Sequence, residues 1–258
     1  MTRRLITTAD DFGDTPEVNE AVLRAYRSGV LRFASLMVRR PAAAAAARIA
    51  RDNPGLGVGL HLELCSDAPE KAGLRYFFDP RARAGLDGEI RSQIEALLAL
   101  GIKPTHVDGH INVHVHPVVF PALCRLAREY SIPRVRLPAG EWEALKGFPG
   151  AERAGTAALA AVFGTMGAWV RGAAEGLELP RTWGLLRSGL MKEDYALWLI
   201  GRLPEGTTEM YFHPTTNPAL RATERPAPSH QSTTELETLL SPKVRRALEE
   251  NGVELVTA

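Results

Sequence analysis

The stretch THVDGHINVHVHP, from Thr105 to Pro117, concentrates side chains that bind metals or move protons. It holds four of the seven histidines of the chain together with one aspartate. His106, Asp108 and His110 are spaced two residues apart, so they share one face of the chain if this segment is extended. Such a segment is either a metal site or an unusual piece of core.

Other ionisable residues follow short apolar runs elsewhere in the chain. Asp10 and Asp11 stand in TADDFG, His61 and Glu63 in GLHLEL, and His213 in YFHP. Adjacent residues on an extended chain point to opposite sides, so one aspartate can bind a metal while the other approaches a water molecule. Each motif alone has an ordinary structural interpretation, such as a helix cap or a hydrogen-bonded core histidine.

The elements that must position these residues alternate between short β-branched runs and longer helical patterns. This alternation predicts parallel strands joined by crossover helices. About eight such units in ~250 residues predict an α/β fold with an irregular TIM-like (β/α) barrel, and an open doubly wound sheet is the main alternative. We predict one domain over 1–258, with a helix-rich insertion at about 141–178. The apolar runs lie at 4–9, 34–38, 56–64, 105–108, 134–138, 182–186, 208–212 and 253–257.

In both kinds of fold, functional residues collect at the carboxyl ends of the strands. Four predicted strands end in ionisable residues, which packing alone does not explain, because buried ionisable groups need partners. Two histidines and a carboxylate with open positions form a hydrolytic zinc set. The same ligand types also serve non-haem Fe(II) oxygenases, so ligand types alone leave the chemistry open.

Composition narrows the class of protein. The chain carries a formal net charge of +1 without a basic run, which argues against a nucleic-acid partner. Two cysteines form no disulfide framework and the N-terminus lacks a signal peptide, so we expect a cytoplasmic protein. The run GTAALAAVFGTMGAWV is short and rich in Gly and Thr for a transmembrane segment. The region Ala151–Ala174 is either a lid for a lipid substrate or an ordinary core helix.

The motifs TADDFG, GLHLEL, HVDGHINVHVHP and YFHP, in this order, resemble the YdjC-like carbohydrate deacetylase family, which includes chito-oligosaccharide deacetylases. The stretches RYFFDPRARAGLDGEIRSQIEALLALGI, WGLLRSGLMKEDY and LPEGTTEMYFHPTT are similar to one branch, the hopanoid-biosynthesis-associated deacetylases. That branch is thought to remove an acetyl group from an N-acetylglucosaminyl hopanoid lipid. The family fold is an irregular TIM-like barrel.

The resemblance implies a role for each matching residue. Asp11, His61 and His110 would hold one divalent metal ion, Zn²⁺ or Mg²⁺. Asp10 matches the proposed general base, and His213 stands where related deacetylases place a general acid.

Three further residues are candidates for a supporting or substrate-binding role. Asp108 would orient a metal ligand. Glu63 shares a face with His61 and either enters the site or pairs with an arginine. Trp183 is the tryptophan best placed in sequence to stack on a sugar ring.

The leading hypothesis is a hydrolase of carbohydrate metabolism, a metal-dependent N-deacetylase that releases acetate from an N-acetylated amino sugar. The sugar would belong to an N-acetylglucosaminyl hopanoid or to a soluble chito-oligosaccharide. A homodimer and a peripheral membrane contact, without a transmembrane segment, are further expectations. The alternatives are a two-metal phosphoesterase, with ligands drawn from His106, His114 and Asp108, and a non-catalytic sugar- or lipid-binding relative.

Overall fold

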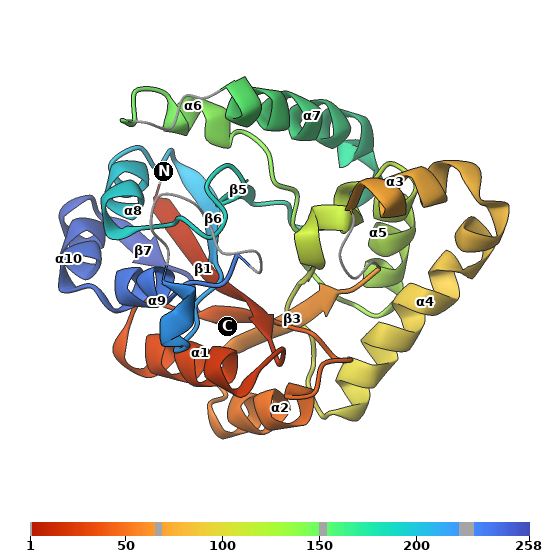
Figure 1. The fold of residues 1–258 in the computed structure, drawn as a ribbon, viewed down its shortest axis with the longest axis horizontal. Coiled ribbons are helices and arrows are strands. Elements are labelled where there is room, and N and C mark those ends of the chain that lie inside the picture. The colour runs from red at the N-terminus through yellow and green to blue at the C-terminus, as the bar shows by residue number, and fades with distance from the viewer. Residues whose placement is uncertain (1, 65–68, 150–153, 222–229) are drawn as a thin grey trace.

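The computed structural model describes residues 2–64, 69–149, 154–221 and 230–258 and shows one curled parallel sheet surrounded by helices (Figure 1). The strand order is β4-β3-β2-β1-β6-β5, and β7 pairs with the start of β1. Every pairing is parallel. The strands are β1 (Arg3–Phe12), β2 (Phe33–Leu36), β3 (Gly57–Leu62), β4 (Val107–Gly109), β5 (Arg181–Trp183), β6 (Gly206–Phe212) and β7 (Val253–Leu255).

The segment 133–139 bridges the two edges of this half-barrel sheet. The amide of Val107 donates to the carbonyl of Arg134 at 3.0 Å, and the amide of Val135 donates to the carbonyl of Glu178 at 3.1 Å. A further parallel bridge joins Pro138 to Thr182 on β5. The predicted strand at 134–138 therefore exists as isolated bridges, because prolines at both ends remove ladder donors. The α/β class and the irregular barrel are confirmed, and the open doubly wound sheet is excluded.

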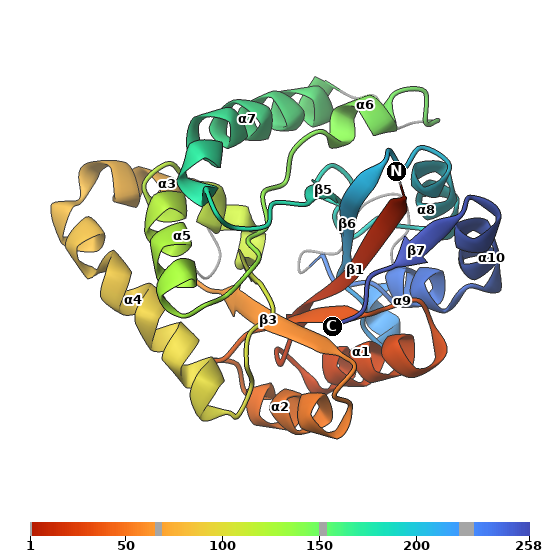
Figure 2. The same cartoon turned by 180° about the vertical axis from the view of Figure 1, so that it is seen from behind.

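Helices pack around the outside of the sheet (Figures 1 and 2). The first begins as predicted, with Thr15 accepting a hydrogen bond from the amide of Val18 at 3.3 Å and Pro16 in the first turn. The helices are α1 (Pro16–Ser28), α2 (Ala43–Asp52), α3 (Pro69–Phe78), α4 (Pro80–Ala99), α5 (Val119–Glu129), α6 (Glu141–Leu145), α7 (Ala154–Val170), α8 (Glu193–Ile200), α9 (Thr233–Leu240) and α10 (Pro242–Glu250). Short 3-10 turns are η1 (His110–Val115), η2 (Arg171–Ala174) and η3 (Pro218–Leu220).

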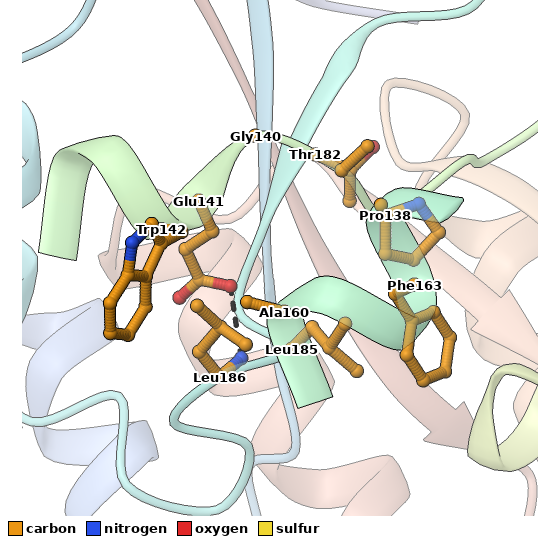
Figure 3. A pocket seen from close by; sticks show the side chains of 11 residues that line it. Pro138, Gly140, Glu141, Trp142, Ala160, Phe163, Thr182, Leu185 and Leu186 are labelled. Atoms are coloured by element: carbon orange, nitrogen blue, oxygen red, sulfur yellow. Dashed lines mark hydrogen bonds between the residues drawn. The ribbon is translucent and has the colours of Figure 1, made fainter. Parts of the chain in front are cut away.

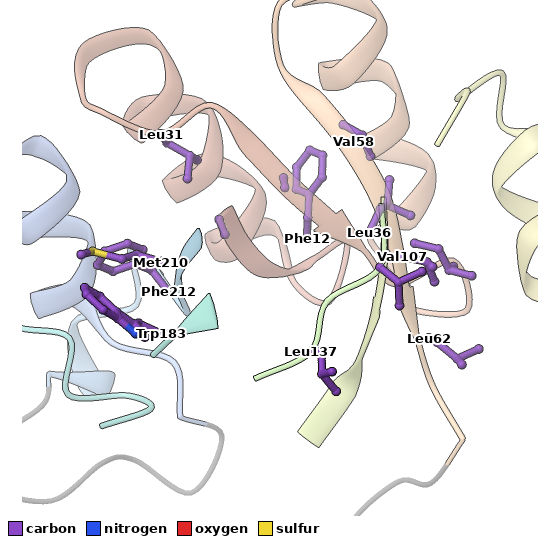
Figure 4. Packing of buried hydrophobic residues seen from close by; sticks show 14 of the residues in the cluster. Phe12, Leu31, Leu36, Val58, Leu62, Val107, Leu137, Trp183, Met210 and Phe212 are labelled. Carbon is purple, nitrogen blue, oxygen red and sulfur yellow. The ribbon is translucent and has the colours of Figure 1, made fainter. Parts of the chain in front are cut away.

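The two faces of the sheet differ in polarity. Met210 and Phe212 of β6 belong to the apolar cluster beneath the helices, whereas Glu209 and Tyr211 alternate with them. Side chains alternate across a strand, so Glu209 and Tyr211 lie on the inner face. Figure 4 shows part of the apolar cluster, which includes Phe12, Leu36, Val58, Leu62, Val107, Leu137, Trp183, Met210 and Phe212. The inner face instead carries polar side chains, and these lie toward the carboxyl ends of the strands.

The predicted insertion at about 141–178 contains α6, α7 and η2, and its boundaries stay a prediction. The helical stretch Ala154–Ala174 is long and apolar enough to cross a membrane, by length and composition alone. It is not a core helix, because Trp169 is 72% exposed and Val162 is 53% exposed. Residues 151–153 of the region considered above lie outside the described residues.

Candidate active site and metal centre

Three residues remote in sequence meet at the carboxyl ends of β1 and β3 and at the start of η1. Oδ1 of Asp11 lies 3.1 Å from Nδ1 of His110 and 3.5 Å from Nε2 of His61. The candidate ligand atoms of the three residues all lie within 4.8 Å of one another. The structure thus brings together the three residues predicted as metal ligands.

The donor atoms fit a divalent metal ion. Ligand atoms of a tetrahedral zinc site, with bonds of about 2.0–2.2 Å, lie roughly 3.3–3.6 Å apart. The contacts of Asp11 at 3.1 and 3.5 Å are close to this spacing. Burial would raise the pKa of Asp11, but hydrogen bonds from His110 and His61 hold it well below its usual range, so the carboxylate is ionised. Imidazole nitrogen and carboxylate oxygen are both common ligands of divalent metal ions in proteins.

Asp108 fixes the orientation of His61. Its Oδ1 lies 2.6 Å from Nδ1 of His61, and its Oδ2 accepts a hydrogen bond from Ser35 at 2.6 Å. With Nδ1 bound to a carboxylate, the imidazole presents Nε2 to Asp11, the arrangement common among metal-binding histidines. Burial alone would lower the pKa of His61, yet the carboxylates of Asp10 and Asp108 raise it to about 10. The cluster therefore attracts positive charge.

Arg136 is a buried cation that sequence reasoning missed. Its guanidinium donates two hydrogen bonds to Asp10, at 2.6 and 2.8 Å, and another at 2.9 Å to Oε1 of Glu209. It also lies 2.8 Å from Oδ2 of Asp108. Burial raises the pKa of Asp10 to about 6, although the charge of Arg136 opposes the shift. The available signal was the run RVRLP, in which two arginines share one face of an extended segment.

Arg136 also excludes a second metal ion from the neighbouring acidic group. Asp10, His61 and Asp108 are close enough to form a ligand set. A metal ion there would be repelled by the guanidinium of Arg136, which already bridges the carboxylates of Asp10 and Asp108. Within the described part of the chain, Asp11, His61 and His110 therefore form the ligand group left open for an ion.

The histidines considered for a second metal serve other contacts. Nε2 of His106 lies 3.0 Å from Oγ of Ser35, and Nε2 of His114 lies 3.0 Å from the carbonyl of Arg136. Burial lowers the pKa of His106 to about 3 and that of His114 to about 4, so both are neutral. The geometry gives no support to a two-metal phosphoesterase.

His213 lies next to Asp10 at the end of β6. Its Nε2 is 3.9 Å from Oδ2 of Asp10, and its side chain is 11% exposed. Its backbone amide donates to Glu235 at 2.5 Å. Burial lowers the pKa of His213 to about 3, so the imidazole is neutral around pH 7. The two residues predicted as acid and base thus lie side by side.

The structure does not bring Glu63 and Trp183 to the metal cluster. Oε1 of Glu63 accepts a hydrogen bond from Arg40 at 2.7 Å, which is the arginine pairing weighed as its alternative role. Trp183 is 2% exposed and lies beside Met210 and Phe212 (Figure 4). Its ring belongs to the apolar cluster, on the face of the sheet away from the site. This position does not support the predicted stacking of Trp183 on a sugar ring.

An apolar pocket lies between α6, α7 and the loop after β5 (Figure 3). Its one carboxylate, that of Glu141, accepts hydrogen bonds from the amide of Leu186 at 3.0 Å and from Tyr195 at 2.8 Å. The first bond holds the loop after β5 against α6, and the second joins α8 to α6. The pocket is lined by residues 138–142 together with Ala160, Phe163, Gly164, Thr182, Leu185 and Leu186.

The chain is similar to known proteins over most of its length. Residues 4–250 match the family model described as YdjC-like protein. The chain is 39% identical over 145 residues to a carbohydrate deacetylase of Geobacillus stearothermophilus, a match that covers 52% of this chain and 59% of that protein. It is 30% identical over 226 residues to a carbohydrate deacetylase of Thermoanaerobacter pseudethanolicus, covering 81% of this chain and 80% of the relative.

Solved structures share the fold. A putative cellobiose-phosphate cleavage protein from Enterococcus faecalis superposes with a TM-score of 0.72 at 22% identity, covering 99% of this chain and 97% of the other. A lactam utilization protein from Thermus thermophilus gives a TM-score of 0.52 at 18% identity, with 99% of each chain covered. At these identities the likeness concerns the fold alone.

Proposed function

Because the chain belongs to the YdjC-like protein family, we propose that it is a metal-dependent N-deacetylase acting on an N-acetylated amino sugar. The observation that carries this proposal is the group of Asp11, His61 and His110, which lies beside the pair of Asp10 and His213. A ligand set with open positions next to an acid and a base suits hydrolysis of an amide. A binding protein has no need for that adjacent pair.

A bound divalent ion supplies a polarised acetamide carbonyl and a more acidic water molecule. Asp10 accepts the proton of the attacking water, and the two hydrogen bonds from Arg136 hold its carboxylate in one orientation. A pKa of about 6 places Asp10 near the value expected of a base that works around neutral pH.

His213 then delivers a proton to the departing amine, which is a poor leaving group without it. The neutral imidazole must first gain this proton, and Asp10 lies 3.9 Å from its Nε2. That distance exceeds a direct hydrogen bond, so a small side-chain movement or a bridging water completes the transfer. The products are acetate and a free amino sugar.

We further propose that the amino sugar is attached to a lipid, as in an N-acetylglucosaminyl hopanoid. Support comes from the exposed apolar surface of α7. Soluble chito-oligosaccharides are the alternative substrates. A cytoplasmic location, a peripheral membrane contact and a homodimer stay predictions from the sequence.

Acetate release from two substrates tests the proposal. The zinc-loaded protein is incubated with N-acetylglucosaminyl hopanoid and, separately, with N,N′-diacetylchitobiose, with Asp10→Asn as the inactive control. Acetate from either substrate supports the deacetylase, and the substrate with the larger kcat/KM identifies the aglycone. Binding of both without acetate release would identify a non-catalytic relative.

A further inference from the structure

The side chain of Gln231 lies between two carboxylates next to the candidate metal cluster. Its Nε2 donates a hydrogen bond to Oδ2 of Asp14 at 2.8 Å and lies 3.4 Å from Oδ2 of Asp11. Gln231 is only 5% exposed. Both neighbouring groups are hydrogen-bond acceptors, so the amide must present its NH₂ group to them.

The contacts of Asp11 divide between its two oxygens. Oδ1 faces His110 and His61, at 3.1 and 3.5 Å, whereas Oδ2 faces Gln231. We propose that Gln231 is a positioning residue that holds Asp11 as a one-oxygen ligand of the metal ion. This inference rests on the proposed function, because a second bond through Oδ2 would fill a coordination position that water and substrate need.

The backbone around Asp11 is already fixed by other bonds. Asp11 adopts a left-handed conformation with φ 61°, which is uncommon for a residue other than glycine. The amide of Asp14 donates to the carbonyl of Asp11 at 3.0 Å, and the amide of Gly13 donates to Asn19 at 2.8 Å. The remaining freedom of Asp11 is rotation of its carboxylate, which is what a donor to Oδ2 restrains.

Gln231 is itself held by the residue that follows it and by the carboxylate of Asp14. The amide of Ser232 donates to the carbonyl of His213 at 2.8 Å, which ties this segment to the end of β6. Oδ1 of Asp14 lies 3.6 Å from Nε of Arg40, whereas Oδ2 of Asp14 faces Gln231. The hydrogen bond to Oδ2 of Asp14 keeps the NH₂ group of Gln231, and not its oxygen, turned toward Asp11.

The test is the zinc affinity of Gln231→Met, measured by titrating Zn²⁺ into the metal-free full chain against a competing chelator. Methionine keeps the length of glutamine but donates no hydrogen bond. Residues that orient metal ligands typically contribute 10–100-fold to affinity, so we expect binding weaker by roughly that factor. An affinity equal to that of the wild type overturns the proposal.

Gln93→Met is the matched control. Gln93 is fully buried, and its amide bonds to the backbone of Glu63 at 2.7 and 3.0 Å. We expect this variant to lose stability toward urea but to bind zinc as the wild type does. An equal loss of zinc affinity in both variants would mean a general effect of losing a buried glutamine, and would overturn the proposal.

Asp14→Asn decides the matter if Gln231→Met does not fold. It removes the charge that orients the amide of Gln231, so we expect a smaller loss of zinc affinity in the same direction, and unchanged affinity overturns the proposal. The affinity ratio is independent of turnover. If the wild type binds zinc but releases no acetate, the proposed function fails while the positioning role is still judged by that ratio.

Discussion

At the scale of single residues, one guanidinium makes the polar interior of the sheet stable. Arg136 is 1% exposed and contacts the carboxylates of Asp10, Asp108 and Glu209. Carboxylates buried this deeply need a countercharge, because the low-dielectric interior penalises unpaired charge. The same cation restricts metal binding to the neighbouring group of ligands.

Replacing Arg136 by methionine should therefore destabilise the protein strongly. Removing one partner of a buried ion pair typically costs about 3–5 kcal/mol, and we expect a loss of this size in the free energy of unfolding measured with urea. Arg136→Lys keeps the charge but not the fork of donors, so its loss should be smaller. A Met variant as stable as the wild type would show that the network contributes nothing to folding.

The two residues assigned to proton transfer should affect rate without affecting metal content. General acid–base groups contribute roughly 10²–10⁴-fold, so Asp10→Asn and His213→Gln should each lower kcat by about that factor. Zinc content by elemental analysis should equal that of the wild type. Undiminished kcat in either variant would remove that residue from the mechanism.

Part of the site could be predicted from the sequence, because aspartate and histidine residues near the ends of predicted strands indicate a metal site. Asp11, His61 and His110 are of this kind. Arg136 and Gln231 were missed, since arginines in a short apolar run and a glutamine in a loop have many ordinary roles. Trp183 was assigned without knowing which face of β5 it occupies, and alternation along a strand places it on the apolar face.

At the scale of elements, close packing between β3 and the segment before β4 sets the position of His61. A Cβ added at Gly59 would lie 2.5 Å from the carbonyl oxygen of His106, closer than real contacts allow. Leu60 donates its amide to that same carbonyl at 3.0 Å. The small residue in β3 thus lets the two segments approach.

Gly59→Ala should lower the free energy of unfolding by about 1–3 kcal/mol, the usual cost of overpacking. Gly88→Ala is the control, because Gly88 lies within α4 and a Cβ there meets nothing within 4 Å. Alanine in a helix interior should stabilise by roughly 0.5–1 kcal/mol. Urea unfolding checks both variants, and equal stability of the two would contradict this account of the packing.

The predicted bounds of the strands were wrong where the backbone departs from regular strand geometry. The strand expected over 182–186 ends at Trp183, because Gly184 has φ 127° and packs against the carbonyl of Tyr211. The run at 134–138 reads as a full strand but pairs only through isolated bridges. Apolar periodicity carries no information about such local conformations.

At the scale of the whole molecule, α7 presents an apolar face to solvent. Its outer residues include Trp169, at 72% exposure, and Val162, at 53%. The helix carries no charged residue from Ala154 to Val170. A surface helix ordinarily has a polar outer face, and exposed apolar surface often marks a site of interaction. A lipid-linked substrate would explain this surface.

The double variant Trp169→Ser, Val162→Ser tests that explanation. It should leave stability and turnover of N,N′-diacetylchitobiose unchanged, since these side chains contact solvent. On the hopanoid substrate, loss of apolar contact worth about 1.5–3 kcal/mol should lower kcat/KM by roughly 10-fold or more. If the double variant changes kcat/KM by the same factor for both substrates, the result argues against a lipid contact at α7.

The central claim is that one divalent ion is held by Asp11, His61 and His110. The most direct measurement is the number of zinc ions bound per chain, for the wild type and for the alanine variants of these three residues. We predict one ion per chain in the wild type and loss of binding in each variant. Two ions per chain, or zinc retained by all three variants, would contradict the account.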